Sequence, residues 1–270
     1  MEQQQNWRGN FQTFRQVIPQ MEELPFQARE AINVLRGNIQ LSGFELRTIA
    51  VTSAMPNEGK SSTAFRLAKS MAGLGTRTIY LDCDIRISEV MARYQIQQSV
   101  CGLSEFLCGR VSLNDIIYHT DDPCMDMIFT GAVAPNPSEL LSGPLFVQLL
   151  DELKKNYEYV IVDTPPVCPV IDGALIAKKC DGTILVVECG KTEKTLAVKA
   201  TRQLEYAGVR ILGAVLNKVG ASNKGYGYGY GYGYGYGYGY GKGNTKKAAK
   251  KQNKAAQNGN VKSVRDKKRA

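Results

Sequence analysis

Residues 51–63 read VTSAMPNEGKSST, and this stretch decides the fold of the chain. An apolar run, Thr48 to Val51, leads into a Pro-Asn-Glu-Gly turn, and the residues from Lys60 onward open a helical pattern. A strand, a glycine-containing turn, a Lys-Ser pair and a helix, in this order, are typical of a phosphate-binding loop. The backbone N–H groups of such a loop and the N-terminus of its helix face phosphate oxygens. The stretch therefore predicts a site for a nucleoside triphosphate.

The residue types of this loop suggest what each of them does. We expect Lys60 to reach the terminal phosphates and the Ser61 hydroxyl to ligate Mg2+. The usual pattern begins with Gly six positions before the Lys, where this chain has Ala54, so the alternative is an ordinary strand–turn–helix corner. The other residues expected to contact the nucleotide are Pro56, Asn57, Glu58, Gly59 and Ser62.

Acidic residues that suit a metal and a proton transfer follow two other apolar runs. Asp163, in YVIVDTPP, ends one run, at the place of an Asp that orients Mg2+. Asp82 and Asp84, in IYLDCDIR, end another, and two carboxylates two residues apart on an extended segment point the same way. One of the two is expected to order Mg2+ through water, while the other accepts a proton from an attacking hydroxyl. Arg86, next on the same face, is expected to contact a phosphate. The alternative is that Asp82 and Asp84 cap the strand and pair with Arg86.

Apolar runs alternate with helical patterns along the chain. Strands are expected at 48–54, 78–82, 126–130, 159–163, 183–188 and 211–217. Helices are expected at 25–41, 59–73, 88–94, 103–107, 113–119, 172–179 and 192–207, with one or two more at 137–156. This alternation predicts a mostly parallel sheet between two helical layers, a three-layer α/β/α fold. The loop and both acidic motifs come at the carboxyl ends of strands, where such sheets bind ligands. Asn217 ends the last strand and either reads the adenine edge or caps the strand.

The helix expected at 25–41 should bury one face. The spacing of Ala31, Val34, Leu35 and Asn38 predicts that these residues share it.

Charge and composition divide the chain into four segments: an arm at 1–25, expected to be loosely attached, a globular domain at 26–224, a Gly-Tyr alternation at 225–241 and a basic tail at 242–270. The tail holds eleven Lys or Arg and one acid, and subtracting its +10 from the net +9 leaves −1 for residues 1–241. No apolar run approaches the length of a transmembrane helix, and seven scattered Cys predict reduced thiols in the cytoplasm.

Eight of the fourteen tyrosines lie in the Gly-Tyr segment, and the other six are expected to be structural. Neither tail segment can bury a core, so both are expected to be mobile. The eight tyrosines of the Gly-Tyr segment are Tyr226, Tyr228, Tyr230, Tyr232, Tyr234, Tyr236, Tyr238 and Tyr240.

TSAMPNEGKSS, IYLDCDIR and YVIVDTPP together resemble the three nucleotide motifs of the bacterial tyrosine kinases, P-loop enzymes unrelated to eukaryotic kinases. GLSEFLCG at 102–109, PNPSELLS at 135–142 and the tyrosine-rich tail are similar to further segments of that family, and the resemblance covers roughly residues 28–241. It implies a P-loop NTPase fold like that of MinD and ParA, the cofactors ATP and Mg2+, and autophosphorylation of the C-terminal tyrosines in trans. By family position, Asp82 resembles the proposed base, and Asp84 and Asp163 resemble the metal-orienting acids.

The resemblance also implies partners. The soluble Gram-positive type of this family works in the cytoplasm, at the inner face of the membrane, with a transmembrane activator related to polysaccharide chain-length regulators. Such kinases regulate capsule or exopolysaccharide synthesis, phosphorylate proteins such as sugar-nucleotide dehydrogenases, and are opposed by a cognate tyrosine phosphatase. Many form homo-oligomeric rings through an E-x-x-R-x-x-R helix motif, in which Glu30 and Arg36 match here and Asn33 replaces the middle Arg.

A second function is an ATPase switch of the partition or septum-positioning type, which cycles on membrane or DNA. Those relatives carry an extra Lys early in the loop, where this chain has Met55, and they have no use for eight tyrosines. These features favour the kinase, and a nucleic-acid partner is not expected. The basic end is instead expected to contact the anionic inner leaflet of the membrane or the membrane partner, and the alternative is that it only keeps the chain soluble. Phosphates on the tyrosines, each adding about −1.5 to −2 charges, would weaken that contact.

Overall fold

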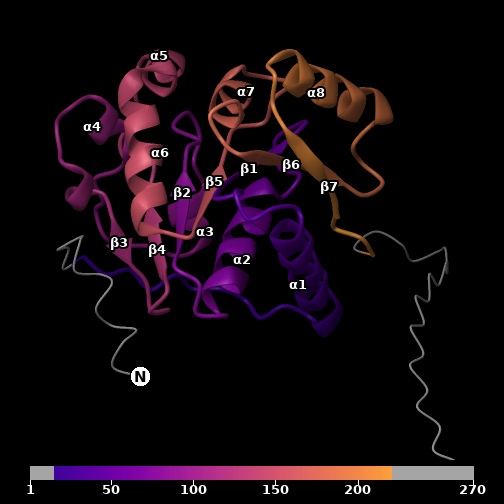
Figure 1. The fold of residues 1–270 in the computed structure, drawn as a ribbon, viewed down its shortest axis with the longest axis horizontal. Helices are drawn as coiled ribbons and strands as arrows, with labels where there is room; N and C mark the ends of the chain where they lie inside the picture. Colours follow the sequence, from indigo (N-terminus) through magenta and orange to yellow (C-terminus); the bar gives the residue numbers. More distant parts are fainter. Residues whose placement is uncertain (1–14, 221–270) are drawn as a thin grey trace, which may run out of the picture. The chain divides into compact units, whose positions relative to one another are not determined.

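The computed structural model describes residues 15–220, which form a seven-stranded sheet with helices on both faces (Figure 1). The elements in chain order are α1 Phe26–Leu41, β1 Thr48–Ser53, α2 Lys60–Ala72, β2 Thr78–Asp82, α3 Val90–Arg93, α4 Leu103–Leu107, the 3-10 helix η3 Leu113–Asp115, β3 Tyr118–His119, β4 Met125–Ile128, α5 Pro137–Ser142, α6 Pro144–Asn156, β5 Tyr159–Asp163, α7 Asp172–Ala177, β6 Gly182–Glu188, α8 Lys194–Tyr206 and β7 Ile211–Asn217. Each of the six expected strands is present, with its ends within two residues of the expected ones.

The strands lie in the order β3-β4-β2-β5-β1-β6-β7, and all neighbours are parallel except β3 and β4. The chain runs from β1 to β2 on one side of β1, and from β5 across β1 to β6 on the other. The carboxyl end of β1 therefore lies at a point where the direction of winding reverses, which is where such sheets bind ligands. The expected α/β class is confirmed.

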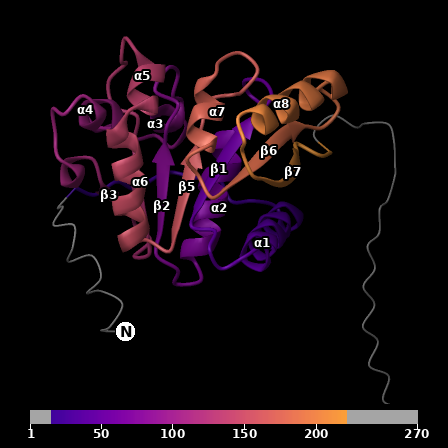
Figure 2. The same cartoon turned by 45° about the horizontal axis from the view of Figure 1, so that its top comes forward.

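The two faces of the sheet are covered by different helices, as the two views in Figures 1 and 2 show. Because side chains alternate along a strand, Ile49 and Val51 of β1 point to one face and Ala50 to the other. The first face packs against α1, α2 and α3, and the second against α4, α5, α6, α7 and α8. The central strands β1 and β2 are buried along their whole length, as the continuous apolar runs predict.

The buried face of α1 differs from the expected one. Ala31, Val34 and Asn38 are exposed, and Val34 keeps 61% of its surface accessible. The stripe that faces the domain instead runs through Ile32, Leu35 and Ile39, with Ile39 3% exposed. The helix is thus turned by about one residue, or roughly 100°. The reason is that Ile32 and Ile39 give this stripe more apolar surface than Ala31 and Asn38 could.

Two further expectations at the β3 edge were wrong. The helix expected at 113–119 is only the 3-10 turn η3, and its last two residues form β3 because they pair with β4. The arm expected to be loose is attached over residues 15–20. Val17 is 3% exposed and its N–H donates to the His119 carbonyl at 2.8 Å, while the Gln20 N–H donates to the Tyr94 carbonyl at 3.0 Å.

Four of the six tyrosines outside the Gly-Tyr segment are buried, whereas Tyr206 is 92% exposed at the end of α8, so its expected structural role was wrong. Within residues 15–220, no helix combines the length and the hydrophobicity that a membrane crossing requires. The expected phosphoacceptor tyrosines and the basic tail lie outside the described residues.

Candidate active site

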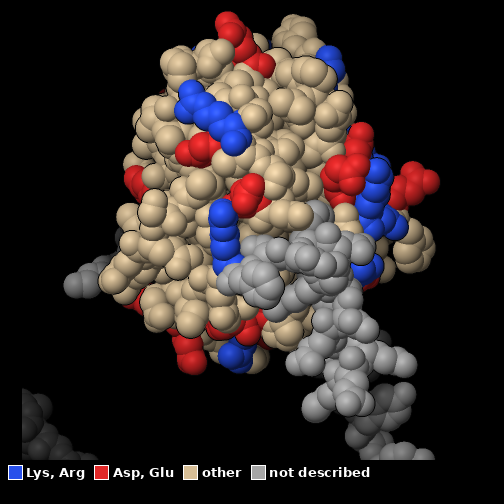
Figure 3. All heavy atoms as spheres, turned by 90° about the vertical axis from the view of Figure 1, so that its left-hand side faces the viewer, with Lys and Arg blue, Asp and Glu red and all other residues tan. Residues whose placement is uncertain are grey.

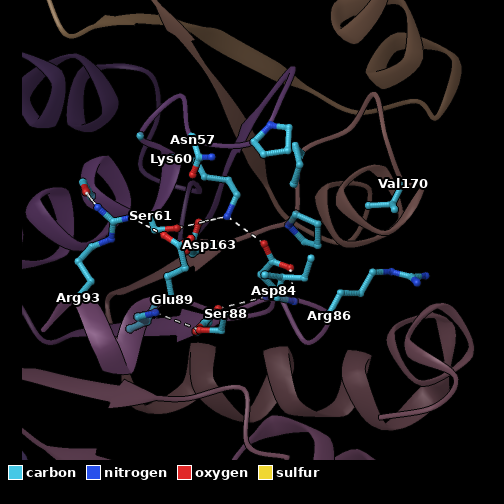
Figure 4. A pocket seen from close by; sticks show the side chains of 18 of the residues that line it. Asn57, Lys60, Ser61, Asp84, Arg86, Ser88, Glu89, Arg93, Asp163 and Val170 are labelled. Atoms are coloured by element: carbon cyan, nitrogen blue, oxygen red, sulfur yellow. Dashed lines mark hydrogen bonds and ion pairs between the residues drawn. The ribbon is translucent and has the colours of Figure 1, made fainter. Parts of the chain in front are cut away.

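The carboxyl ends of β1, β2 and β5 meet at one edge of the sheet. In the strand ladders, Asp163 of β5 lies opposite both Val51 of β1 and Asp82 of β2. The expected phosphate loop joins β1 to α2 at the same edge. A cavity of about 330 Å³ lies there, lined by residues from the segments 56–62, 82–93 and 163–170 (Figure 4). The structure therefore brings the loop and both acidic motifs into one site.

Lys60 is the first residue of α2, and its ammonium lies among carboxylates. Its Nζ donates to Asp84 Oδ2 at 3.1 Å and lies 3.7 Å from Asp163 Oδ1. Only 11% of the Lys60 side chain is exposed. Burial alone would lower the pKa of Lys60, but the attraction of Asp163 and Asp84 outweighs burial and raises it. Lys60 is thus held in its charged form where terminal phosphates are expected.

Asp163 is fully buried at the end of β5. Its Oδ2 accepts the Tyr80 hydroxyl at 2.9 Å, and its Oδ1 receives no hydrogen bond from the described residues. Burial raises the pKa of this carboxyl, against the opposing attraction of Lys60. A buried carboxylate oxygen without a donor can accept a cation or an ordered water.

Asp82 lies next to Asp163 across the β2–β5 pair and is also buried. Its Oδ1 accepts the Asp84 N–H at 3.1 Å, and its Oδ2 accepts the Ser88 hydroxyl. Burial, followed by repulsion from Asp163, raises the pKa of Asp82 to about 7. A carboxylate with a pKa near neutral pH is suited to accept a proton.

Arg86 does not share the orientation of the two acids before it. It lines the cavity, but its guanidinium points away from Lys60 and pairs with Asp172 and Ser138 (Figure 4). The expectation that it continues the face of Asp82 and Asp84 was wrong, because the chain turns after the buried Ile85. The alternative, in which Arg86 pairs with those two acids, was wrong as well.

Glu58 belongs to the loop but its side chain does not line the cavity. Its Oε2 accepts the Met55 N–H at 3.0 Å, and its Oε1 accepts the Thr192 hydroxyl. Glu58 is 3% exposed, so these contacts hold the loop from behind. The side chain is therefore a brace within the loop, which leaves only the backbone of Glu58 for the expected nucleotide contact.

Asn217 and Lys218, at the end of β7, brace the same loop. Asn217 Nδ2 donates to the Glu58 carbonyl at 2.9 Å, and Lys218 Nζ donates to the Asn57 carbonyl at 2.7 Å. Gly59 has φ +96°, and a Cβ there would lie 2.0 Å from Asn217 Nδ2, so only glycine fits. The Asn217 amide is thus engaged by the loop backbone, a role that neither sequence interpretation foresaw.

The oxygen atoms around Lys60 fit a divalent cation. The Ser61 hydroxyl, 3.2 Å from Lys60 Nζ, and the carboxylates of Asp84 and Asp163 are hard oxygen donors. Among residues 15–220, no three His, Cys, Asp or Glu side chains form a metal site by themselves. Mg2+ commonly takes one or two carboxylates and completes its shell with phosphate oxygens and water, which is what this donor set offers.

Sequence reasoning missed three side chains that hold the site acids or their neighbours in place. Tyr80 could have been found, because it alternates with Asp82 along β2 and so points to the same face. Ser88 reaches Asp82 from the segment after β2, and Asp172 reaches Arg86 from the first residue of α7; periodicity predicts neither contact.

Comparisons with known proteins agree with this geometry. A family model described as an AAA domain matches residues 46–205. Tyrosine-protein kinase CpsD of Streptococcus agalactiae is 39% identical over 201 residues, which cover 74% of this chain and 87% of that protein. Tyrosine-protein kinase YwqD of Bacillus subtilis is 34% identical over 190 residues, which cover 70% of this chain and 80% of that protein.

Solved structures give the same result. The kinase domain of the Escherichia coli tyrosine kinase ETK superposes with a TM-score of 0.69 at 31% identity, covering 84% of this chain and 92% of that chain. The septum site-determining protein MinD from Pyrococcus horikoshii, complexed with Mg-ADP, superposes with a TM-score of 0.57 at 22% identity, covering 66% and 72%. The second likeness is one of fold alone.

Proposed function

The chain belongs to the bacterial tyrosine-protein kinases, and we propose that it transfers the terminal phosphate of ATP to tyrosines of its own Gly-Tyr segment, in trans between copies. The observation that carries this proposal is the placement of Lys60 within 3.1 Å of Asp84 and 3.7 Å of Asp163, at the end of a phosphate loop and beside the buried Asp82. Phosphoryl transfer needs mainly positioning and charge stabilisation, and this cluster offers both.

Each residue of the cluster has a proposed role. Backbone N–H groups of the loop and the Lys60 ammonium hold the triphosphate. Their positive charge reduces the repulsion between the phosphates and the tyrosine oxygen that attacks them. Ser61, Asp84 and Asp163 would hold Mg2+, which neutralises charge on the phosphate oxygens. Asp82, whose pKa is raised to about 7, accepts the proton of the tyrosine hydroxyl.

The Gly-Tyr segment suits an acceptor that must reach another copy. A flexible chain spans roughly 5–6 Å times the square root of its residue number, so residues 225–241 reach about 20–25 Å. Alternating glycine gives each tyrosine backbone freedom to enter a site. We propose that several tyrosines of this segment are modified in turn.

We further propose that copies of the chain assemble, although the E-x-x-R-x-x-R motif of the family's rings is incomplete here, with Asn33 in place of the middle Arg. Arg36 donates to the Ser70 hydroxyl at 2.7 Å within its own chain, and Asn33 donates to Glu30 Oε1 at 2.9 Å. The Ser70 hydroxyl also donates to Asn33 Oδ1 at 3.1 Å, so Asn33 and Arg36 lie on the side of α1 next to α2, and of the three motif positions only Glu30 is exposed. The family role extends the proposal to a transmembrane adaptor of the chain-length-regulator type, a cognate phosphatase, sugar-nucleotide dehydrogenase substrates, and control of capsule or exopolysaccharide synthesis.

The ATPase-switch alternative draws support from the MinD-like fold and from the basic tail. Against it, the position that holds an extra Lys in switch ATPases is Met55 here, which carries no charge. The Met55 N–H is bonded to Glu58, and Met55 is 36% exposed. On the face shown in Figure 3, charges of both signs are scattered, with no broad basic surface for DNA among the described residues. The kinase function also accounts for the eight tyrosines of the Gly-Tyr segment, which the switch leaves unexplained.

Incubation of the purified full-length chain with ATP and Mg2+, with the cytoplasmic segment of its adaptor present, tests the proposal. Phosphotyrosine should appear on the chain, should disappear in Lys60→Met, and should fall strongly when the eight tail tyrosines are changed to Phe. ATP hydrolysis without phosphotyrosine, stimulated by vesicles or DNA, would instead support the switch.

A further inference from the structure

The guanidinium of Arg86 is held on the wall of the cavity opposite the phosphate loop. Nη2 donates to Asp172 Oδ1 at 3.3 Å and to Ser138 Oγ at 3.0 Å, and Nε donates to Asp172 Oδ2. The Ser138 hydroxyl also donates to Asp172 Oδ1. These three side chains, here named the Arg86 clamp, tie the segment between β2 and α3 to the first turns of α5 and α7.

The anchor of the clamp is rigid. The Asp172 side chain is fully buried, and two-point contact with a guanidinium fixes its orientation. The next residue, Gly173, lies so close to the loop after β5 that a Cβ would be 2.4 Å from the Pro165 carbonyl. That carbonyl also accepts the Thr52 hydroxyl of β1 at 2.9 Å. Asp172 is therefore tied to the central strands.

The tethered segment orients both acids of the IYLDCDIR motif. The N–H of Ile87 donates to Asp84 Oδ1 at 3.3 Å, and the Ser88 hydroxyl donates to Asp82 Oδ2. Residues 86–89 are all exposed, and Ile87 keeps 76% of its surface accessible, so the core does not hold this stretch. Between the buried Ile85 and Val90, the contacts of Arg86 with Asp172 and Ser138 tie this stretch to more distant parts of the chain.

We propose that Arg86 is a positioning residue of the kinase, which acts through the clamp to hold the Ile87 N–H and the Ser88 hydroxyl on Asp84 and Asp82. This inference rests on the proposed function for its effect on rate, and on geometry alone for its effect on the segment. It also gives a role to PNPSELLS, because Ser138 lies in that stretch. The competing role is direct contact of Arg86 with a nucleotide phosphate.

The test compares full-length wild type with Arg86→Gln, Asp172→Asn, the double variant, and the milder Ser138→Ala. Three quantities are measured: kcat for phosphotyrosine formation, the equilibrium affinity for a fluorescent ATP analogue, and hydrogen exchange of residues 83–90 without nucleotide. Glu158→Gln is the matched control, because it breaks an exposed contact, 3.5 Å from Arg77, at the opposite edge of the sheet.

The clamp predicts that Arg86→Gln and Asp172→Asn each lower kcat on the order of 10- to 100-fold. Nucleotide affinity should stay within about twofold, and the double variant should be no worse than either single one, because both changes break one contact. Ser138→Ala should act in the same direction but less. Arg86→Lys should stay impaired, since Lys keeps the charge without the two-point contact. Residues 83–90 should exchange faster in the clamp variants, while the loop at 56–62 should not change.

Other results would overturn the inference. If Arg86→Gln weakens nucleotide affinity and Asp172→Asn does not, Arg86 contacts phosphate directly. Additive losses in kcat, or unchanged exchange over residues 83–90, would equally exclude the clamp. If the wild-type chain forms no phosphotyrosine, the proposed function fails, and the exchange comparison still decides whether the clamp exists.

Discussion

The pKa of the Asp82 carboxyl depends on the fold. Its pKa is raised to about 7 by burial and by Asp163, so ionising it in the folded state costs free energy. The protonated form contributes stability that is complete below the unfolded pKa, near 3.8, and is lost as the pH rises through about 7.

Asp82→Asn should therefore stabilise the nucleotide-free protein at pH 8, by on the order of 1–2 kcal/mol. The melting temperature should rise by about 2–8 °C at pH 8, with little difference near pH 4. The same change should lower kcat by about 100-fold or more, and wild-type activity should fall as the pH drops below about 7. Asp151→Asn, on the exposed face of α6, is the control and should show neither effect. A variant less stable than wild type at pH 8 would mean that the folded protein favours the charged form of Asp82.

The site residues differ in how far sequence could place them. Lys60, Asp82, Asp84 and Asp163 could be brought together in advance, because strand ends of a parallel sheet converge at one edge. The orientation of Arg86 could not, since it depends on a turn after Ile85 and on a partner 86 residues away. Long-range side-chain contacts of this kind leave no local periodicity.

Two residues at the end of β7 hold the backbone of the phosphate loop, and Thr192 holds the side chain of Glu58. Ala54 replaces the usual first Gly without strain, because among the described non-glycine residues only Asn57, Gln95 and Lys218 have positive φ. Residues at the end of β7 supply the remaining support. Helix rotation was harder to predict than helix position: α1 begins one residue after the expected start and ends where expected, yet buries a different stripe. Both stripes share Leu35 and have helical spacing, and the apolar surface of Ile32 and Ile39, which spacing alone does not weigh, decides between them.

Asn217→Ala tests this support. Losing one hydrogen bond to the loop backbone should weaken nucleotide binding by about fivefold, which corresponds to about 1 kcal/mol. ATP and GTP should be affected alike, because the bracing amide does not contact the base. Affinities come from displacement of a fluorescent nucleotide, with Leu216→Ala as a control on the same strand, where the side chain is 57% exposed. A loss confined to ATP would instead assign Asn217 to the adenine edge.

The chain as a whole joins a nearly neutral domain to a tail segment of +10. Composition is enough to separate these parts, because a Gly-Tyr alternation followed by Lys-rich sequence lacks the apolar surface that a core needs. We expect the positive charge of the basic tail to attract anionic lipid, and phosphates on the Gly-Tyr segment to offset that charge. We expect the unphosphorylated chain to bind vesicles of anionic lipid at low salt, and autophosphorylation to weaken binding at least severalfold. Neutral vesicles are the control, and equal affinity before and after phosphorylation would exclude a charge switch.

The central claim is that one ATP site, built on Lys60 and three acids, phosphorylates the tail of another copy. It is tested most directly by mixing two variants, neither of which can phosphorylate its own tail. One is full-length Lys60→Met, which keeps its tail tyrosines but lacks the catalytic lysine. The other is the full-length chain with the eight tail tyrosines changed to Phe, which keeps its active site. With ATP and Mg2+, mass spectrometry should find phosphotyrosine within residues 226–240 of the Lys60→Met chain, and only in the mixture. Phosphotyrosine on Lys60→Met alone, or none in a mixture where wild type labels itself, would contradict the account.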